Sequence, residues 1–251
     1  MAARGFLGAG DLYIARYNST TGEFDPLDGP FESTKFEIKP NSDLKEMSSR
    51  GRATCGQVIE SVPLPKPSDL SVTLAEVNRE SLAMALFGTA SEINQGSGTI
   101  SETVKARLGK WVQISKENLA SLGFAAKDSA GTTTYVLGDD YEVNWRLGMI
   151  RCLSSGAVTE GQDVKLSGTY NAITGTKISG ATQSQVRAKF RLDGINFADQ
   201  LPSIVDVWEA VLTPDNAFDF LADKFAEITL KGRLKTPAGK TDPFEVNLRD
   251  A

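Results

Sequence analysis

The stretch VPLPKPSDLSVTLAEVNRESLAMALFG, residues 62–88, decides the fold class of this chain. Its three alternate prolines, Pro63, Pro65 and Pro67, each lack a backbone N–H, so they predict an extended segment or a sheet edge and not a central strand. In residues 69–76, apolar side chains alternate with polar or small ones, which is the period of a strand with one buried face. The stretch therefore predicts a protein built on a β-sheet.

A short, bounded helix is predicted directly after this strand. Asn78 is a good N-cap, Val77 and Leu82 stand at the positions of a hydrophobic staple, and Gly88 stands where a left-handed C-cap belongs. The helix is apolar on more than one face, which a helix merely lying on a sheet does not need. Two interpretations stay open: a deeply packed core helix, or a helix shared with a neighbouring subunit through Leu82, Leu86 and Phe87.

The rest of the chain shows the pattern of a β protein, in which alternating segments are separated by turns rich in Gly, Asn, Asp and Pro. No linker or low-complexity tract interrupts it, so one domain over residues 1–251 is expected, and the Gly, Ser and Thr-rich residues 171–184 are interpreted as a long loop. A second helix is predicted after Pro214, where Phe218, Leu221 and Phe225 share one face. The predicted strands are residues 11–17, 31–38, 69–76, 110–114, 132–137, 140–147, 163–170, 185–192, 227–235 and 244–249.

Composition excludes several function classes. The 251 residues contain no histidine, which removes the usual general base, the Ser-His and Cys-His pairs and the commonest zinc ligand. A net charge of -5 argues against a protein that grips nucleic-acid phosphates. The chain shows no signal-peptide h-region and no apolar run long enough for a membrane helix, so a cytosolic protein is expected, with Cys55 and Cys152 reduced and structural. No enzyme activity, catalytic residue, cofactor or metal is predicted.

The few motifs that could carry chemistry have plainer explanations. Gly239-Lys240-Thr241 resembles the end of a phosphate-binding loop but lies between two predicted strands, which favours a turn. Asp139 and Asp140 could be an acid pair, although neighbours on a strand point to opposite faces and a solvated turn is the better interpretation. The Gly-rich residues 1–10 are interpreted as a flexible N-terminal arm.

The order of elements resembles the major tail tube protein of long-tailed bacteriophages. The resemblance rests on the Pro-rich leader, strand and capped helix ending LAMALFG, on GDDYEVNWRLGMIRCLSSGAVTEGQDVKLSGTY (138–170), and on RLDGINFADQLPSIVDVWEAVLTP (191–214) followed by EITLKGRLK. It implies a mainly β fold, a β-sandwich or half-barrel with one or two short flanking helices. It also implies a structural subunit of the virion tail, assembled in the host cytoplasm as stacked hexameric rings that conduct DNA during ejection. The implied partners are the chain itself, the tape measure and other tail proteins, and DNA in transit without sequence-specific binding; no membrane is involved.

Two sets of contact residues follow from this resemblance. Residues 41–61 show no sustained alternation, and we expect a long loop that docks on the next ring through Lys45, Glu46, Met47, Arg50 and Arg52; a mobile loop or a plain hairpin turning at Arg50-Gly51 is the alternative. The cationic strand face of Arg187, Lys189 and Arg191 is expected to meet a neighbouring subunit or solvent.

The alternative function is a carbohydrate- or receptor-binding β-sandwich module of a phage or secreted system. Such modules usually bind through exposed aromatic side chains on loops. Trp111, Trp145 and Trp208 all lie in strand patterns, which predicts core positions and argues against this alternative.

Overall fold

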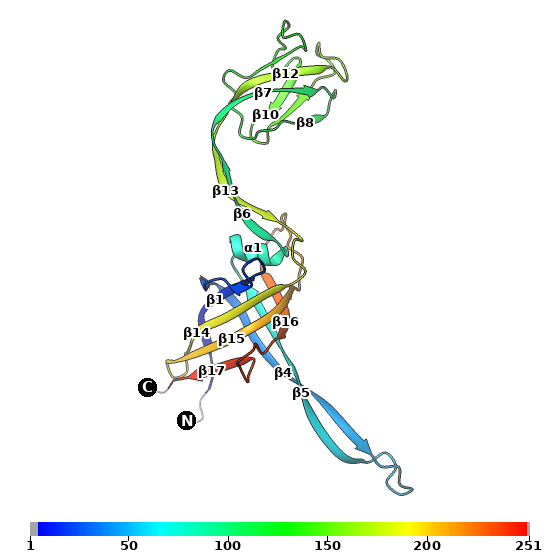
Figure 1. Ribbon diagram of the computed structural model, residues 1–251, viewed down its shortest axis with the longest axis vertical. Coiled ribbons are helices and arrows are strands. Elements are labelled where there is room, and N and C mark those ends of the chain that lie inside the picture. The colour runs from blue at the N-terminus through cyan, green and yellow to red at the C-terminus, as the bar shows by residue number, and fades with distance from the viewer. Residues whose placement is uncertain (1–4, 250–251) are drawn as a thin grey trace. The chain divides into compact units, whose positions relative to one another are not determined.

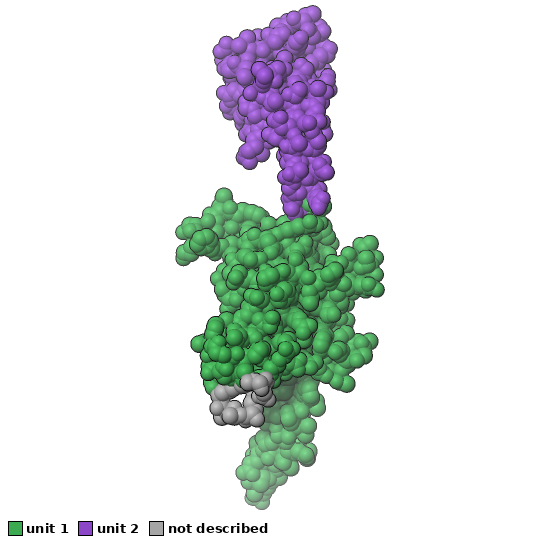
Figure 2. Space-filling view, turned by 90° about the vertical axis from the view of Figure 1, so that its left-hand side faces the viewer, with its two compact units in different colours: residues 1–91, 178–251 green, residues 92–177 purple. Residues whose placement is uncertain are grey.

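The computed structural model describes residues 5–249, and these form two compact units (Figure 1). Unit 1 contains residues 1–91 and 178–251, and unit 2 contains residues 92–177, as coloured in Figure 2. The predicted single domain is therefore replaced by a domain with an insertion. The sequence gives no linker signal because the boundaries fall inside two paired strands, β6 (Thr89–Gln95) and β13 (Ile173–Ser179).

Unit 1 is built on one large antiparallel sheet, so the predicted mainly β, sandwich-like fold is confirmed. Its strands follow the order β2-β1-β14-β15-β16-β5-β4, with β17 on β15 and β3 on β1. The bounds are β1 (Gly8–Asn18), β2 (Glu23–Phe24), β3 (Asp28–Phe31), β4 (Ser33–Ser48), β5 (Val58–Leu74), β14 (Val186–Asn196), β15 (Leu201–Pro214), β16 (Ile228–Leu234) and β17 (Phe244–Leu248).

The core of unit 1 lies on one face of this sheet. Alternate residues of β14 and β5 point into it, and Leu70, Val72 and Phe190 are at most 1% exposed. The helix α1 (Arg79–Ala85) covers part of this face and buries Met84 completely. The period-2 pattern of these strands is the consequence of one-sided burial.

The strand β15 is central to the sheet, yet its sequence does not show the alternation of apolar and polar residues that predicts a strand. It pairs with β14 along its length, with β17 at its first half and with β16 at its second. Ser203 and Ile204 are buried neighbours, and a register shift opposite Ala188 and Phe190 places a bulge between Val207 and Ala210. The bulge moves the core-facing side chains from odd positions, as at Val207, to even positions, as at Ala210 and Leu212, and the simple period therefore disappears.

The N-terminal end of α1 is as predicted, but its C-terminal end is not. The Asn78 side chain accepts hydrogen bonds from the N–H groups of Glu80 and Ser81 at 3.0 and 2.9 Å, while the Ser81 hydroxyl accepts from the Asn78 N–H. At the other end, Phe87 and not Gly88 has the left-handed backbone, with φ 48°. The N–H of Phe87 binds the Met84 carbonyl and that of Gly88 binds the Ala83 carbonyl, the two bonds of a Schellman motif.

Phe87 tolerates this backbone because its ring packs against the core of unit 1. Gly88 is needed for a different reason. A Cβ there would lie 2.8 Å from the Ser179 carbonyl oxygen, so the glycine allows two chain segments to approach closely.

The predicted second helix is wrong: residues 215–227 form a loop between β15 and β16. The Asp215 N–H binds the Thr229 carbonyl at 2.8 Å, and the Asn216 side chain binds both the Glu227 carbonyl and the Thr229 N–H. These bonds hold the two ends of the segment together at adjacent strand ends. A helix of two or three turns would push those ends apart.

The predicted flexible N-terminal arm is wrong for residues 5–10, and residues 1–4 lie outside the described residues. Gly8 begins β1 and pairs with Asn196 of β14. The Asn196 side chain accepts from the Leu7 N–H at 2.9 Å and donates to the Gly5 carbonyl at 3.1 Å. The described part of the arm is therefore an edge of the sheet.

Unit 2 has its own core between two three-stranded sheets. One sheet has the order β10-β11-β8 and the other β7-β12-β9, and side chains such as Ile150 and Leu166 are 1% exposed between them. The bounds are β7 (Gly98–Lys105), β8 (Trp111–Gln113), β9 (Ala125–Lys127), β10 (Tyr141–Asn144), β11 (Met149–Cys152) and β12 (Asp163–Tyr170).

Three predictions for this part of the chain are wrong. Residues 132–137 make only isolated bridges, at Thr134 and Leu137, and form no strand. The expected loop at 171–184 contains β13. Trp111, expected in the core, is 42% exposed, whereas Trp145 packs against the core of unit 2 at 5.4 Å from Phe124.

In the described chain α1 has seven residues, and no helix there is both long and apolar enough to span a membrane.

The two cores predict two separable unfolding transitions. Leu166→Ala should destabilise unit 2 by about 3 kcal/mol and leave unit 1 unchanged, because a buried leucine is lost from one core only. Leu70→Ala, equally buried in unit 1, is the matched variant with the reverse result. Hydrogen exchange read by mass spectrometry along a urea series assigns each transition; one common transition shifted by both variants would contradict the two-unit fold.

Candidate functional site: the β4–β5 arm

The most distinctive feature of unit 1 is a long hairpin that leaves the sheet (Figure 1). Pairing of β5 with β16 covers only Asp69 to Leu74. Pairing of β5 with β4 continues to Val58, opposite Ser48. Residues 41–68, here called the arm, are therefore a two-stranded ribbon closed by a tip at residues 49–57.

Both faces of the arm expose apolar side chains. Residues opposite one another across the ribbon share a face, so Leu44 lies with Pro63 on one face, while Val62 and Leu64 lie on the other. A two-stranded ribbon has no second layer of structure packed on it to cover these side chains. The exposed large side chains are Leu44 (55%), Met47 (61%), Val58 (51%), Ile59 (59%), Val62 (46%) and Leu64 (46%).

The three prolines of the leader lie in the β5 half of the arm, in an extended strand with one neighbour, as predicted. Pro63 and Pro65 are two residues apart in the paired ribbon, so their missing N–H groups fall on the same edge of the strand. Pro67 lies at a register shift, where its carbonyl accepts a hydrogen bond from the Asn41 side chain at 3.1 Å. The other edge keeps its donors for the ladder with β4. This arrangement lets a proline-rich segment form a long ribbon and blocks one of its edges against further pairing.

The charges of the arm form a local pattern. Asp43 lies 2.9 Å from the Lys45 ammonium and 3.5 Å from that of Lys66. The hydrogen bond from Lys45, and then the charge of Lys66, hold the pKa of Asp43 below its ordinary value. At the tip, Arg50 and Arg52 form no ion pair with any residue from 5 to 249, so the arm ends in two free positive charges.

The tip is an ordered turn. The Ser49 and Thr54 hydroxyls lie 2.6 Å apart, and the Gly56 N–H binds the Ser49 carbonyl at 2.9 Å with φ 86° at the glycine. Cys55 is exposed here, so its interpretation as a structural thiol is wrong, whereas Cys152 is buried in unit 2 and burial raises its pKa.

All five residues predicted to contact the next ring lie on the arm and are exposed. Lys45, Glu46 and Met47 belong to β4, and Arg50 and Arg52 belong to the tip. The expected long loop is wrong, since most of the segment is strand. Neither face is buried, and so no period marks these strands. The signal that could have located them is the row of alternate prolines, which requires an extended chain with a partner on one edge only.

The residues around the helix that were predicted to contact a neighbouring subunit do not gather with the arm. Leu82, Leu86 and Phe87 are half-buried around α1, and Phe87 packs against the core of the same chain. Their contact with a neighbouring subunit stays a prediction.

The cationic face of β14 is satisfied largely within the chain. Arg187 lies 2.7 Å from the buried carboxylate of Glu209 and its guanidinium covers the ring of Tyr17 at 3.7 Å. Lys189 lies over the ring of Phe24 at 5.5 Å. Arg191, whose side chain is 50% exposed, lies 3.5 Å from Asp206 and is the most accessible of the three.

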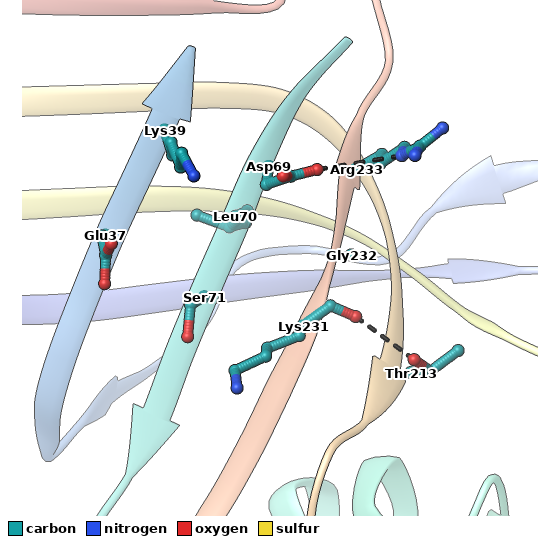
Figure 3. Close-up of a pocket in the computed structure, with 9 residues that line it drawn as sticks. All are labelled: Glu37, Lys39, Asp69, Leu70, Ser71, Thr213, Lys231, Gly232 and Arg233. Carbon is teal, nitrogen blue, oxygen red and sulfur yellow. Dashed lines mark hydrogen bonds and ion pairs between the residues drawn. The ribbon is translucent and has the colours of Figure 1, made fainter. Parts of the chain in front are cut away.

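A shallow pocket lies on the outer face of the sheet, beside the base of the arm (Figure 3). Charged side chains of both signs line it, and Asp69 and Arg233 lie 3.8 Å apart across two strands. Among residues 5–249, no group of three or more Asp, Glu, Cys or His side chains is placed to hold a metal ion. The pocket is a nearly charge-balanced sheet surface, lined chiefly by Glu37, Lys39, Asp69, Lys231 and Arg233.

The weak chemistry motifs are turns. The Asp140 carboxylate accepts hydrogen bonds from the N–H groups of Ala157 at 2.7 Å and Val136 at 2.8 Å. These two bonds, that of Ala157 first, lower the pKa of Asp140, and they explain the residue as a support of the surrounding loops. Gly239 has φ 88° and turns the chain between β16 and β17.

The buried carboxylate of Glu209 generates a stability prediction. Arg187 and Lys235 both bind it, the latter at 3.0 Å, so Glu209→Ala leaves a cation poorly solvated and should destabilise unit 1 by about 2–3 kcal/mol. Arg191→Ala, at the exposed pair with Asp206, should cost less than about 1 kcal/mol. Urea unfolding at neutral pH compares the stability of the two variants. Equal losses of unfolding free energy would show that burial does not make the Glu209 pair more important for stability than the exposed pair.

Comparison with known proteins identifies a family and no function. No curated protein matches the sequence. A family model described as protein of unknown function UCP028589 matches residues 5–243, which include the arm, α1 and all of unit 2. Because the match covers nearly the whole chain, this protein belongs to the family of proteins of unknown function UCP028589.

Proposed function

We propose that this chain is the structural subunit of a phage tail tube, assembling as stacked hexameric rings whose lumen conducts DNA during ejection. The observation that carries the proposal is the arm, a ribbon of two strands that exposes apolar side chains on both faces. Surfaces of this kind mark sites of association. The resemblance in element order to the tail tube family supplies the kind of assembly.

The arm fits a repeating assembly better than a transient complex. A two-stranded ribbon is marginally stable in water by itself, so a segment of this length gains from a surface that covers it. In an assembly of identical copies, every subunit can receive the arm of another. A contact between two different patches of the same chain then propagates as a filament.

Two further features agree with a tube. Contacts around a ring would use the half-buried Leu82 of α1, Leu86 and Phe87 just after it, and the accessible Arg191 on β14. Six copies carry a formal charge of -30, six times -5 per chain, which suits passage of DNA without specific binding. The partners in this proposal are other copies, the tape measure and other tail proteins, in the virion tail after assembly in the host cytoplasm. The proposal assigns the chain no catalytic role and no cofactor.

A second candidate function, a carbohydrate- or receptor-binding module, is favoured by one observation in unit 2. Trp111 is 42% exposed on β8, and the guanidinium of Arg151 lies 4.9 Å from its ring centre. Arg151 in turn is paired with Glu142 on β10. An exposed aromatic ring beside fixed polar groups is the chemistry that stacks on a sugar ring.

Removal of the arm tests the tube. Replacing residues 42–65 by Asn-Gly joins the paired Asn41 and Lys66 through a two-residue turn and leaves the sheet intact. The variant should fold, because the arm contributes nothing to either core, and should form no tubes in negative-stain electron microscopy. Wild-type chain at the same concentration should form them, with Leu122→Ser, at an exposed site of unit 2, as a matched control. Tubes of normal length from the variant would rule out the arm as the assembly contact.

The second candidate is tested separately on unit 2. If unit 2 binds glycans, the chain should bind to the immobilised sugars of a glycan array. Trp111→Ala should reduce that binding at least tenfold, because it removes the stacking surface. Trp145→Phe, at a ring packed against the core, is the control for general damage. Binding that survives Trp111→Ala, or absence of any binding, contradicts this candidate.

A further inference from the structure

A second apolar surface of unit 1 lies in the loop between β15 and β16. This segment, residues 215–227 and here called the Phe220 loop, contains the apolar residues that would form one face of a helix. Three large apolar side chains of the loop point into solvent: Phe220 is 68% exposed, Leu221 94% and Phe225 102%. Exposure of three large apolar side chains within six residues is costly in water and indicates a surface that a partner covers.

The Phe220 loop is held in place by hydrogen bonds and by packing. Asn216 bridges its two ends with hydrogen bonds of 2.8 Å to the Glu227 carbonyl and 2.9 Å from the Thr229 N–H. Phe218 packs against the core of unit 1 and its ring lies 4.8 Å from that of Phe220, edge to face. The exposed side chains are therefore presented from an anchored base.

The Phe220 loop and the tip of the arm have complementary character. The loop contains four carboxylates, Asp215, Asp219, Asp223 and Glu227, and one ammonium, Lys224, which gives a formal charge of -3. The tip, residues 49–57, contains two arginines and no acidic residue, and the exposed Met47 and Val58 flank it. Each surface combines apolar side chains with charge, and the two charges have opposite sign.

These two surfaces lie at opposite ends of one strand. Ile228, which follows the Phe220 loop directly, pairs with Leu74 at the last residue of β5, whereas the tip precedes Val58 at its first. At about 3.3 Å per residue, the 17 residues of β5 separate the two surfaces by roughly 50 Å. The tip of one chain cannot reach the Phe220 loop of the same chain.

We propose that the Phe220 loop is the receptor for the arm tip of a second copy of this chain. Arg50 and Arg52 of one copy approach the carboxylates of Asp219 and Asp223 of the next, and Met47 and Val58 contact Phe220, Leu221 and Phe225. Because donor and receptor lie at opposite ends of β5, the contact is head to tail and generates an open filament. This inference rests on the proposed tube and names the surface that stacks its rings.

The first test removes the apolar part of the receptor. Leu221→Ser with Phe225→Ser changes two side chains that are almost fully exposed, so circular dichroism and thermal melting should match wild type. The protein concentration needed for filaments in light scattering should rise at least tenfold. Leu122→Ser, 89% exposed in unit 2, should leave it unchanged. Assembly of the double variant at the wild-type concentration would overturn the inference.

The second test exchanges charges between two chains. Chain X carries Arg50→Glu and Arg52→Glu, and chain Y carries Asp219→Arg and Asp223→Arg. Each chain alone brings like charges together at every contact and should not assemble. In a mixture, every contact between X and Y is complementary, an acidic tip on a basic loop or a basic tip on an acidic loop, so filaments of alternating copies should form.

The outcomes separate this inference from the proposed function. If the chain without its arm fails to assemble while the Phe220-loop variants, X and Y all assemble as wild type does, the receptor is wrong and the tube stands. If X and Y are each defective and stay so when mixed, the pairing of tip and loop is wrong. A wild-type chain that forms neither rings nor filaments contradicts the tube and the receptor together.

Discussion

A strand in a two-stranded ribbon has one neighbour, and this constraint shapes the arm of unit 1. In the sheet of unit 1, β5 lies between β16 and β4 and buries one face on the core. Beyond Asp69 the pairing with β16 ends, while the pairing with β4 continues for more than ten residues of β5. From that point neither face can be covered by the chain itself, and apolar side chains such as Leu44 and Val62 remain in water. In the proposed tube, another copy of the chain supplies the layer that covers them.

The strand β5 also gives unit 1 two chemically different ends. At one end lie α1, held by the Asn78 cap, and the Phe220 loop, held by the side chain of Asn216. At the other lies the basic tip of the arm. A subunit with a donor at one end and a receptor at the other has the polarity that stacking in one direction requires.

Unit 2 has a core of its own. Its core, around Ile150 and Leu166, shares no residue with that of unit 1, and the chain enters and leaves it through the paired strands β6 and β13. An insertion of this kind can change without disturbing the sheet that carries the arm. The exposed Trp111, beside Arg151, shows that its surface is chemically distinct from that of the arm.

The sequence by itself determined the parts of the fold in which one face is buried. Alternation located β1, β12, β14 and β16, the Asn78 cap located the start of α1, and the alternate prolines located an extended strand with a free edge. The rest of the arm was expected as a loop, and the role of its charged residues as contacts stays a prediction.

Tertiary structure alone decided the remainder. A bulge shifts the buried face of β15 from odd to even positions, and the arm buries neither face, so neither leaves a simple period in the sequence. The helical pattern at Phe218, Leu221 and Phe225 did not form a helix, because hydrogen bonds hold the two ends of its loop together. The division into two units was hidden because paired strands, not a linker, connect them. Hydrophobic periodicity records one-sided burial, whereas the number of neighbours that a strand acquires is fixed only when distant segments meet.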